Sequence, residues 1–349
     1  MTVRAFVMEG IGKTGFAEKS VPLPGPRDAV IKTTHALICT SDTHTVRGAI
    51  GDRSNLTLGH EAVGIVSAVG SDITHFGVGD RVVVGAITPD WGDLASQAGH
   101  PSQSGQPLGG WKFANVKDGV FAEYFHVNEA DANMAHIPAD VASEAAVYCA
   151  DMMSTGFAAA ENGAIPIGGT VAVFAVGPVG QMAVAGARML GAGLIVAVDA
   201  DPERLELARH FGADVTIDIR LEDPVAKILA LTGGVDCAIE ALGDDDAFGN
   251  CIRATRAGGT ISNVGYHGKG EYVRIPREAW GVGMAEKTIR TALCPGGRLR
   301  LGRLLRLIEG DRIDPTPLTT HRFGFEEMAD AFAMMDAKSD CVIKPLVVF

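Results

Sequence analysis

Three residues with metal-binding side chains stand far apart in the sequence: Cys39, His60 and Asp151. Together they offer a thiolate, an imidazole and a carboxylate, the mixed donor set that a catalytic zinc ion uses while a fourth position stays open. Each residue alone also has a structural interpretation, because a buried cysteine is usually inert, a histidine can be hydrogen-bonded in a core, and an aspartate can cap a helix. The combination indicates one zinc site if the fold brings the three residues together.

A glycine-containing loop lies between a predicted strand, residues 170–174, and a helix expected to begin near Gln181. Backbone N–H groups at the positive end of such a helix bind pyrophosphate, so the loop is typical of a dinucleotide site. The residues expected to contact the dinucleotide are Gly177, Pro178, Val179 and Gly180. The alternative is a purely structural turn, since Ala175 replaces the first glycine of the usual fingerprint.

The next predicted strand ends at Asp199, 19 residues after Gly180. A carboxylate in this position accepts hydrogen bonds from the adenosine ribose and repels a 2′-phosphate. Because Ala200 and Asp201 offer no cation to offset the repulsion, we expect a preference for NAD(H) over NADP(H). Arg204 is expected to cover the adenine or a helix face, and a phosphate clamp is the less favoured role.

Two residues shortly after Cys39 have side chains that transfer protons, Ser41 and His44. A hydroxyl beside the metal can bond the substrate oxygen, and an imidazole has an ordinary pKa close to neutrality. We therefore predict a relay from the substrate oxygen through Ser41 and the nicotinamide ribose to His44. In the alternative interpretation, both side chains only satisfy the backbone of a local turn.

The rest of the chain divides into two kinds of pattern. Short alternating or apolar runs, separated by glycine and proline, extend from Val3 to about Val127 and predict a β-rich domain with a polar excursion at 89–118. From about Thr155 strands, turns and helices alternate, as in a doubly wound parallel sheet, and the last part of the chain returns to the first domain. The strands expected in the parallel sheet are 170–174, 194–198, 215–217, 235–240, 260–264 and 288–293.

The composition favours a globular enzyme with a small-molecule substrate. Of 349 residues 47% are hydrophobic, enough for two packed domains. With 30 basic and 42 acidic residues the net charge is −12, and nucleic acid is not expected as a partner because such binding depends on Lys and Arg. A membrane is not expected either, and six cysteines without a signal peptide predict a cytoplasmic location.

These motifs resemble the zinc-dependent medium-chain alcohol dehydrogenases, most closely the microbial secondary alcohol dehydrogenases. The matching segments cover essentially the whole chain and include Cys39–His44, Gly59–Gly64, Thr88–Trp91, Gly110–Phe113, Asp151–Gly156, Tyr266–Gly268 and Leu293–Arg298. The resemblance implies an α/β fold, in which 1–154 and 296–349 form a β-rich GroES-like catalytic domain and 155–295 a doubly wound Rossmann domain. It also implies a homotetramer, with a dimer as the alternative.

The resemblance assigns roles to single residues as well. Cys39, His60 and Asp151 would be the zinc ligands, and Glu61 the neighbouring carboxylate that approaches the metal when substrate is absent. A largely apolar substrate pocket would be lined by Ile50, Ala86, Trp111, Tyr266, Leu293 and Cys294. Many family members bind a second, structural zinc, but no cysteine lies between Cys39 and Cys149, so we expect one catalytic zinc per chain.

The expected reaction is reversible hydride transfer between NAD(H) and a secondary alcohol or ketone, with zinc as the Lewis acid. Two alternatives stay open at this point. A polyol or primary-alcohol/aldehyde dehydrogenase would use the same metal with a different pocket, and polyols in particular would call for a more polar one. A zinc-free quinone or enone reductase would share the fold without needing the cysteine, histidine and aspartate.

Overall fold

The computed structural model describes residues 2–349, and the chain divides into two compact units. The first unit comprises the chain up to Ser154 together with Cys294–Phe349, and the second comprises Thr155–Leu293. Cys294 and Pro295, which we expected in the second domain, group with the first unit instead. One contact that joins this segment to the first unit is the hydrogen bond that the Ser154 hydroxyl donates to the carbonyl of Pro295 at 2.7 Å.

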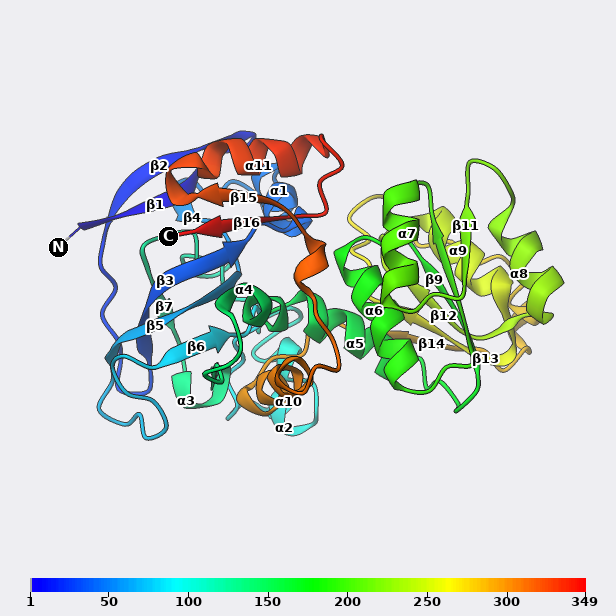
Figure 1. Ribbon diagram of the computed structural model, residues 1–349, viewed down its shortest axis with the longest axis horizontal. Helices are drawn as coiled ribbons and strands as arrows, with labels where there is room; N and C mark the ends of the chain where they lie inside the picture. The colour runs from blue at the N-terminus through cyan, green and yellow to red at the C-terminus, as the bar shows by residue number, and fades with distance from the viewer. Residues whose placement is uncertain (1) are drawn as a thin grey trace. The chain divides into compact units, whose positions relative to one another are not determined.

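Two sheets build the first unit, as expected for a β-rich domain (Figure 1). A three-stranded sheet has the order β2-β1-β4, and a seven-stranded sheet has the order β15-β16-β3-β5-β6-β8, with β7 also paired to β3. All pairs are antiparallel except β15 with β16. The strands are β1 (Thr2–Gly10), β2 (Lys13–Ser20), β3 (Ala29–Leu37), β4 (Leu56–Thr57), β5 (Glu61–Val69), β6 (Arg81–Val84), β7 (Tyr124–Val127), β8 (Met134–His136), β15 (Thr319–Gly324) and β16 (Lys344–Val348).

Helix α11 covers part of the larger sheet of this unit and closes its core (Figure 1). Phe332 and Met335 of α11 are buried in one apolar cluster with Ile31 and Val66 of the central strands. These side chains pack because strands bury alternate residues and a helix buries one face. The helices that begin in this unit are α1 (Thr40–Val46), α2 (Leu94–Gln97), α3 (Ala130–Asn133), α4 (Ser143–Ala146), α5 (Met152–Asn162), α10 (Arg298–Glu309) and α11 (Met328–Ala337).

The second unit is a six-stranded parallel sheet with the order β11-β10-β9-β12-β13-β14, a doubly wound fold (Figure 1). Helices α8 and α9 pack on one face, where Ile228 and Phe248 join the buried cluster of the strands. The elements are β9 (Thr170–Phe174), α6 (Pro178–Met189), β10 (Leu194–Asp199), α7 (Pro202–Phe211), β11 (Val215–Asp218), α8 (Pro224–Thr232), β12 (Val235–Glu240), α9 (Asp245–Ala254), β13 (Thr255–Asn263) and β14 (Thr288–Thr291).

Local sequence signals set several helix ends in this unit. The Asp201 carboxylate accepts a hydrogen bond from the Glu203 N–H at 2.9 Å and caps α7, while Gly212 ends the helix with φ 115°. Helix α6 begins at Pro178, three residues before the expected start near Gln181. Proline favours the first helical position because its φ is already helical and its missing N–H needs no partner there.

Candidate functional site

The strand register of the first unit brings the predicted metal ligands together. Leu37, the last residue of β3, is the register partner of Glu61, the first residue of β5. Cys39 follows β3 by two residues and His60 directly precedes β5, so the antiparallel pair holds both at one end of the sheet. Asp151 reaches the same place from the segment just before α5.

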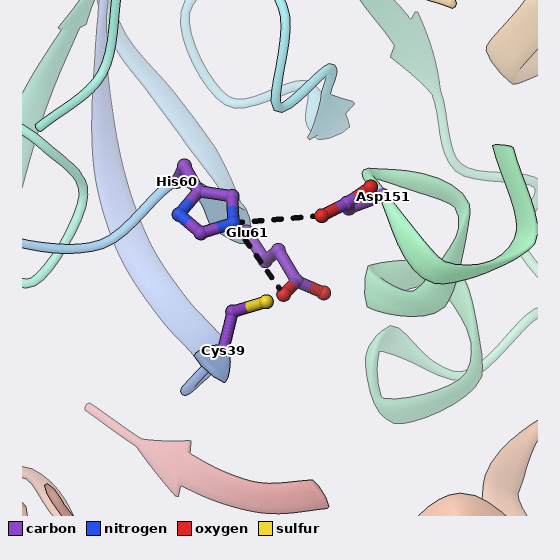
Figure 2. Close-up of side chains that lie close together, drawn as sticks. All are labelled: Cys39, His60, Glu61 and Asp151. Atoms are coloured by element: carbon purple, nitrogen blue, oxygen red, sulfur yellow. Dashed lines mark ion pairs between the residues drawn. The ribbon is translucent and has the colours of Figure 1, made fainter. Parts of the chain in front are cut away.

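The ligand atoms of Cys39, His60, Glu61 and Asp151 all lie within 4.8 Å of one another. Figure 2 shows the Nε2 atom of the His60 ring facing the two carboxylates, at 3.5 Å from Asp151 Oδ2 and 3.8 Å from Glu61 Oε1. In the described chain this is the one group of three or more metal-binding side chains close enough to share an ion. One sulfur, one nitrogen and carboxylate oxygens at this spacing fit zinc.

Asp42, which the sequence analysis did not single out, orients His60 from outside the ligand group. Its Oδ1 lies 3.0 Å from His60 Nδ1, and its Oδ2 accepts a hydrogen bond from the Cys39 N–H at 2.8 Å. A histidine that donates from Nδ1 to a carboxylate turns its Nε2 lone pair toward the metal position. The spacing of three residues between Cys39 and Asp42 at a helix start was the available signal.

Electrostatics shifts the pKa of both the histidine and the cysteine in the absence of a metal, and a bound metal would displace the proton of His60. Burial lowers the pKa of His60, but the carboxylates of Asp42 and Asp151 outweigh it and hold the pKa well above its usual value. Burial raises the pKa of Cys39, but Lys344 and His60 outweigh it and lower the pKa to about 7. The thiolate is therefore accessible near neutrality, which is the form that binds a metal.

A buried lysine from the far end of the chain completes the site. Lys344 of β16 and Glu61 are both fully buried, with Nζ 2.5 Å from Oε1. The sequence analysis missed Lys344, because nothing in a strand near the C-terminus marks a lysine as a partner of residue 61. Its positive charge offsets part of the negative charge that the thiolate and carboxylates bring into the core.

Ser41 lies on the metal cluster, as the relay requires. Its hydroxyl donates to Cys39 Sγ at 3.1 Å and lies 3.3 Å from His60 Nε2. His44 follows Ser41 by three residues on α1, a spacing that places two side chains on one face of a helix. The relay between them stays a prediction.

The predicted pocket residues are spread over both units. Ala86 and Cys294 are buried beside the metal cluster, because the Ala86 N–H at 3.0 Å and the Cys294 thiol at 3.7 Å both donate to the carbonyl of Ala150, the neighbour of Asp151. Ile50 and Trp111 are half-buried in the first unit, and Tyr266 and Leu293 belong to the second. The pocket as a whole stays a prediction.

The glycine loop of the second unit has the geometry of a pyrophosphate-binding turn. Gly177 is the N-cap of α6 and has open space where a side chain would project, so a ligand can approach its backbone. A Cβ on Gly180 would lie 2.0 Å from the Ala175 carbonyl, so glycine permits the close packing of helix and turn. Ala175 has φ 69°, the left-handed conformation for which the fingerprint normally uses glycine. Val179, the fourth predicted contact, follows Pro178 in the first turn of α6.

Asp199 closes the same loop from the end of β10. Its Oδ2 accepts from the Val176 N–H at 2.8 Å, and its Oδ1 accepts from the N–H groups of Ala200 and Asp201 at 2.8 and 3.0 Å. Arg204 lies on α7 with its Nε 3.6 Å from Asp201 Oδ2. The carboxylate of Asp199 therefore has three backbone donors of its own.

Several known proteins are similar to this chain along its whole length. An NADP-dependent isopropanol dehydrogenase of Thermoanaerobacter brockii is 50% identical over 99% of both chains. The protein of the same name in Clostridium beijerinckii is 45% identical over 99% of this chain and 100% of its own. Two further relatives, 48% and 47% identical, carry NADP-dependent names as well, one of them marked probable.

The predicted preference for NAD(H) over NADP(H) is wrong by this comparison, because these relatives are named for NADP. The prediction rested on the repulsion between Asp199 and a 2′-phosphate. In the structure both carboxylate oxygens of Asp199 are occupied by backbone N–H groups. Donors that point at a carboxylate offset part of its charge, so one acidic residue does not decide the preference.

No helix in residues 2–349 has the length and apolar character needed to cross a bilayer.

Solved structures share the fold over nearly the whole chain. An alcohol dehydrogenase of Thermus sp. ATN1 matches with a TM-score of 0.88 at 29% identity over 99% of both chains. A zinc-dependent alcohol dehydrogenase of Streptococcus pneumonia matches with a TM-score of 0.90 at 29% identity, over 99% of this chain and 98% of its own. Residues 25–139 match the alcohol dehydrogenase GroES-like domain, and residues 178–309 match the zinc-binding dehydrogenase family. With its metal cluster, its parallel sheet and a relative 50% identical over 99% of its length, the chain belongs to the zinc-dependent medium-chain alcohol dehydrogenase family.

Proposed function

We propose that this chain interconverts secondary alcohols and ketones, with a nicotinamide dinucleotide as the hydride carrier. One observation carries the proposal: a thiolate, an imidazole and a carboxylate lie in one cluster in a chain that is 50% identical to an isopropanol dehydrogenase. The relatives' names favour NADP(H) as the dinucleotide.

Cys39, His60 and Asp151 would hold one zinc ion per chain. Zinc, when bound, supplies a Lewis acid that polarises the carbonyl or lowers the pKa of the alcohol. The chain contributes the orientation of its own ligands, since Asp42 holds His60 by Nδ1 and Lys344 holds Glu61 by Oε1. We propose no structural zinc, since no cysteine lies between Cys39 and Cys149.

The proton would move along α1. The hydroxyl of Ser41, 3.1 Å from Cys39 Sγ, would donate its proton to the substrate oxygen in ketone reduction and accept one in alcohol oxidation. His44, three residues further along the helix, would exchange that proton with water through the ribose hydroxyl. An imidazole suits this step because its ordinary pKa is close to neutrality.

A bound nicotinamide dinucleotide would supply or accept the hydride. Its pyrophosphate would rest on the backbone N–H groups at the start of α6, beside Gly177. Asp199 holds that loop through the Val176 N–H, and Arg204 lies on α7, the next helix of the unit. These groups bind and position the cofactor without taking part in the chemistry.

We further propose a homotetramer, with a dimer as the alternative. Strand β14 is the edge of its sheet, and edge strands are open to pairing with another chain. Three apolar side chains shortly before it, Tyr272, Val282 and Met284, are 74%, 59% and 77% exposed. Exposed apolar side chains near an edge strand favour a subunit interface, and sedimentation equilibrium gives the number of chains.

The substrate class is tested by initial rates of the purified full chain with acetone, butanone, propanal and butanal, each with NADPH and with NADH. Rates of oxidation of 2-propanol and sorbitol are measured with NADP+ and with NAD+. Methyl ketones should react faster than aldehydes of the same carbon number, because an aldehyde leaves one side of the pocket unfilled. Faster rates with aldehydes or sorbitol would favour a primary-alcohol or polyol dehydrogenase. Full activity after removal of zinc would favour a zinc-free reductase.

A further inference from the structure

Glu240 is a fully buried carboxylate at the carboxyl end of β12, outside the metal site. Its Oε1 accepts hydrogen bonds from the N–H groups of Leu242 and Gly243 at 2.9 and 2.8 Å. Its Oε2 is also buried and accepts no hydrogen bond within residues 2–349. A buried carboxylate oxygen without a donor is costly, so its surroundings need an explanation.

The nearest cation-forming group is His267, whose Nε2 lies 3.5 Å from Glu240 Oε2. The amide of Asn263 fixes the state of this nitrogen. Asn263 donates through Nδ2 to the Gly265 carbonyl at 3.1 Å, so its Oδ1 faces His267 Nε2 at 2.9 Å as an acceptor. Nε2 therefore carries a hydrogen, which it donates to Asn263, and the same nitrogen lies close to Glu240 Oε2.

The second ring nitrogen of His267 also faces a carboxylate. Nδ1 is buried without a hydrogen-bond partner among the described residues, and it lies 3.8 Å from Asp245 Oδ1 at the start of α9. The ring edge packs against Phe248 at 5.7 Å between centroids. The histidine thus stands between two acidic side chains. Burial raises the pKa of Glu240, and bonds from Gly243 and Leu242 act against this rise, so the ionised form gains from the histidine beside it.

The pair lies next to the nucleotide loop. Glu240 is the register partner of Phe174, the last residue of β9, and the Ala241 N–H donates to the Phe174 carbonyl at 3.1 Å. The strand order reverses between β9 and β12, and ligands of doubly wound sheets bind at this switch point, outside the carboxyl ends of the strands. The turns after β12 and β13 therefore border the place where a dinucleotide binds.

These two turns approach each other closely. A Cβ on Gly243, which has φ 83°, would lie 2.2 Å from the Tyr266 carbonyl oxygen. A Cβ on Gly265 would lie 2.1 Å from Glu240 Oε2. Only glycine fits both positions, and the side chains of Glu240 and His267 meet where the turns approach each other.

We infer that Glu240 and His267 are positioning residues that hold the two turns together as one wall of the dinucleotide site. The inference rests on the proposed function, since it assumes that the second unit binds a nicotinamide dinucleotide. It predicts that weakening the pair raises the Kd and KM of the dinucleotide, while kcat at saturation and zinc content change little.

Glu240→Gln isolates the charge, because glutamine keeps the length and one oxygen for Leu242 and Gly243. Asp236→Asn is a matched control at the amino end of the same strand, where Asp236 accepts hydrogen bonds from the N–H and hydroxyl of Thr170 at 2.7 and 2.9 Å. Both changes convert a hydrogen-bonded carboxylate into an amide within β12. Only Glu240 lies at the edge where the dinucleotide binds.

The experiment titrates the full-length protein and its Glu240→Gln, His267→Gln, double and Asp236→Asn variants with NADPH and with NADH, and measures the melting temperature of each. Loss of a charge-assisted contact should raise the Kd of Glu240→Gln by roughly 10-fold, with a double variant no weaker than the weaker single variant. Asp236→Asn should keep the wild-type Kd even if its melting temperature falls.

Three results would overturn the inference: a wild-type Kd in Glu240→Gln, an equal rise in Asp236→Asn, or independent, additive effects of the two single changes. If Glu240→Gln does not fold, a wild-type Kd in His267→Gln overturns it in the same way. Wild-type protein that binds neither NADPH nor NADH would instead overturn the proposed function.

Discussion

Lys344 and Glu61 form an ion pair of 2.5 Å between two fully buried side chains, and Glu61 follows the metal-binding His60 directly in the chain. Burial lowers the pKa of Lys344, but the anionic groups of Cys39 and Glu61 outweigh it and raise that pKa. The protonated form of the lysine is therefore favoured beside Glu61. It compensates an acidic residue that cannot reach water.

Replacing Lys344 by methionine should destabilise the first unit. Removing one partner of a buried ion pair leaves the other charge unpaired, which costs about 3–5 kcal/mol of unfolding free energy. Urea denaturation measures the loss. The double variant Lys344→Met/Glu61→Gln should recover part of it, because no charge is then left alone. Equal losses in the single and double variants would show that packing of the lysine chain, and not its charge, matters here.

Replacing Cys39 by alanine should remove zinc and abolish turnover while the fold persists. The thiolate is one of three ligands, and the unit has its own apolar core. Elemental analysis should give one zinc per chain for the wild type and much less for the variant. Cys149→Ala is the control, because Cys149 is a buried cysteine that lies outside the cluster. Two zinc ions per chain, or full activity without Cys39, would contradict the assignment.

Replacing Ser41 by alanine should lower turnover by roughly the 10²–10⁴-fold that a positioned proton donor contributes, at constant zinc content. Steady-state rates and elemental analysis test both halves of this expectation. Thr43→Val is a control on the same helix, since the Thr43 hydroxyl bonds only the carbonyl of Thr40 in the described chain. Near-wild-type turnover in Ser41→Ala would leave water as the proton carrier.

Replacing Asp199 by glycine should raise the ratio of kcat/KM for NADPH to that for NADH, whatever its wild-type value. A carboxylate at the end of β10 repels a 2′-phosphate, and its removal relieves only the phosphorylated cofactor. The variant should also lose stability, since three backbone N–H groups lose their acceptor. Asp214→Asn controls for stability alone, because Asp214 lies just before β11 and its carboxylate accepts a hydrogen bond from the Ile195 N–H near the start of β10. An unchanged ratio would indicate that the 2′-phosphate of NADPH does not lie close to Asp199.

The stabilising effect of Asp236 should disappear in acid. Burial raises its pKa, but hydrogen bonds from Thr170 and Arg256 outweigh this and lower it below the usual value. A lowered carboxyl pKa contributes stability above the unfolded value of about 3.9, and this contribution is lost as pH falls through the folded value. The unfolding free energies of wild type and Asp236→Asn should therefore differ at pH 7 and converge near pH 2. A constant difference across this range would mean that the charge is not responsible.

Short-range features of this chain could be predicted from sequence because the interactions are local. Asp201 caps α7 through a residue two positions away, and Gly212 ends that helix by its own φ. The loop around Gly177 lies between a strand and a helix that are adjacent in sequence. The start of α6 was misplaced by three residues because Pro178 was not assigned to the first helical turn.

Prediction of the metal cluster depended on residue type, whereas its assembly depended on the tertiary structure. Residue type made Cys39, His60 and Asp151 recognisable as a donor set, whereas their meeting within 4.8 Å depends on the pairing of β3 with β5. The partners of the ligands were not recognisable in advance. Asp42 was hidden among ordinary helix-start residues, although it is only three positions from Cys39.

Lys344 and the pair of Glu240 with His267 were decided by tertiary structure alone. Lys344 meets Glu61 across 283 residues because β16 pairs with β3, and β3 pairs with β5. Glu240 meets His267 because parallel neighbours β12 and β13 end at the same edge of their sheet. The sequence determines the chemistry of each side chain. Which charged side chains are buried together depends on strand order and register, because these are set by the packing of the whole core.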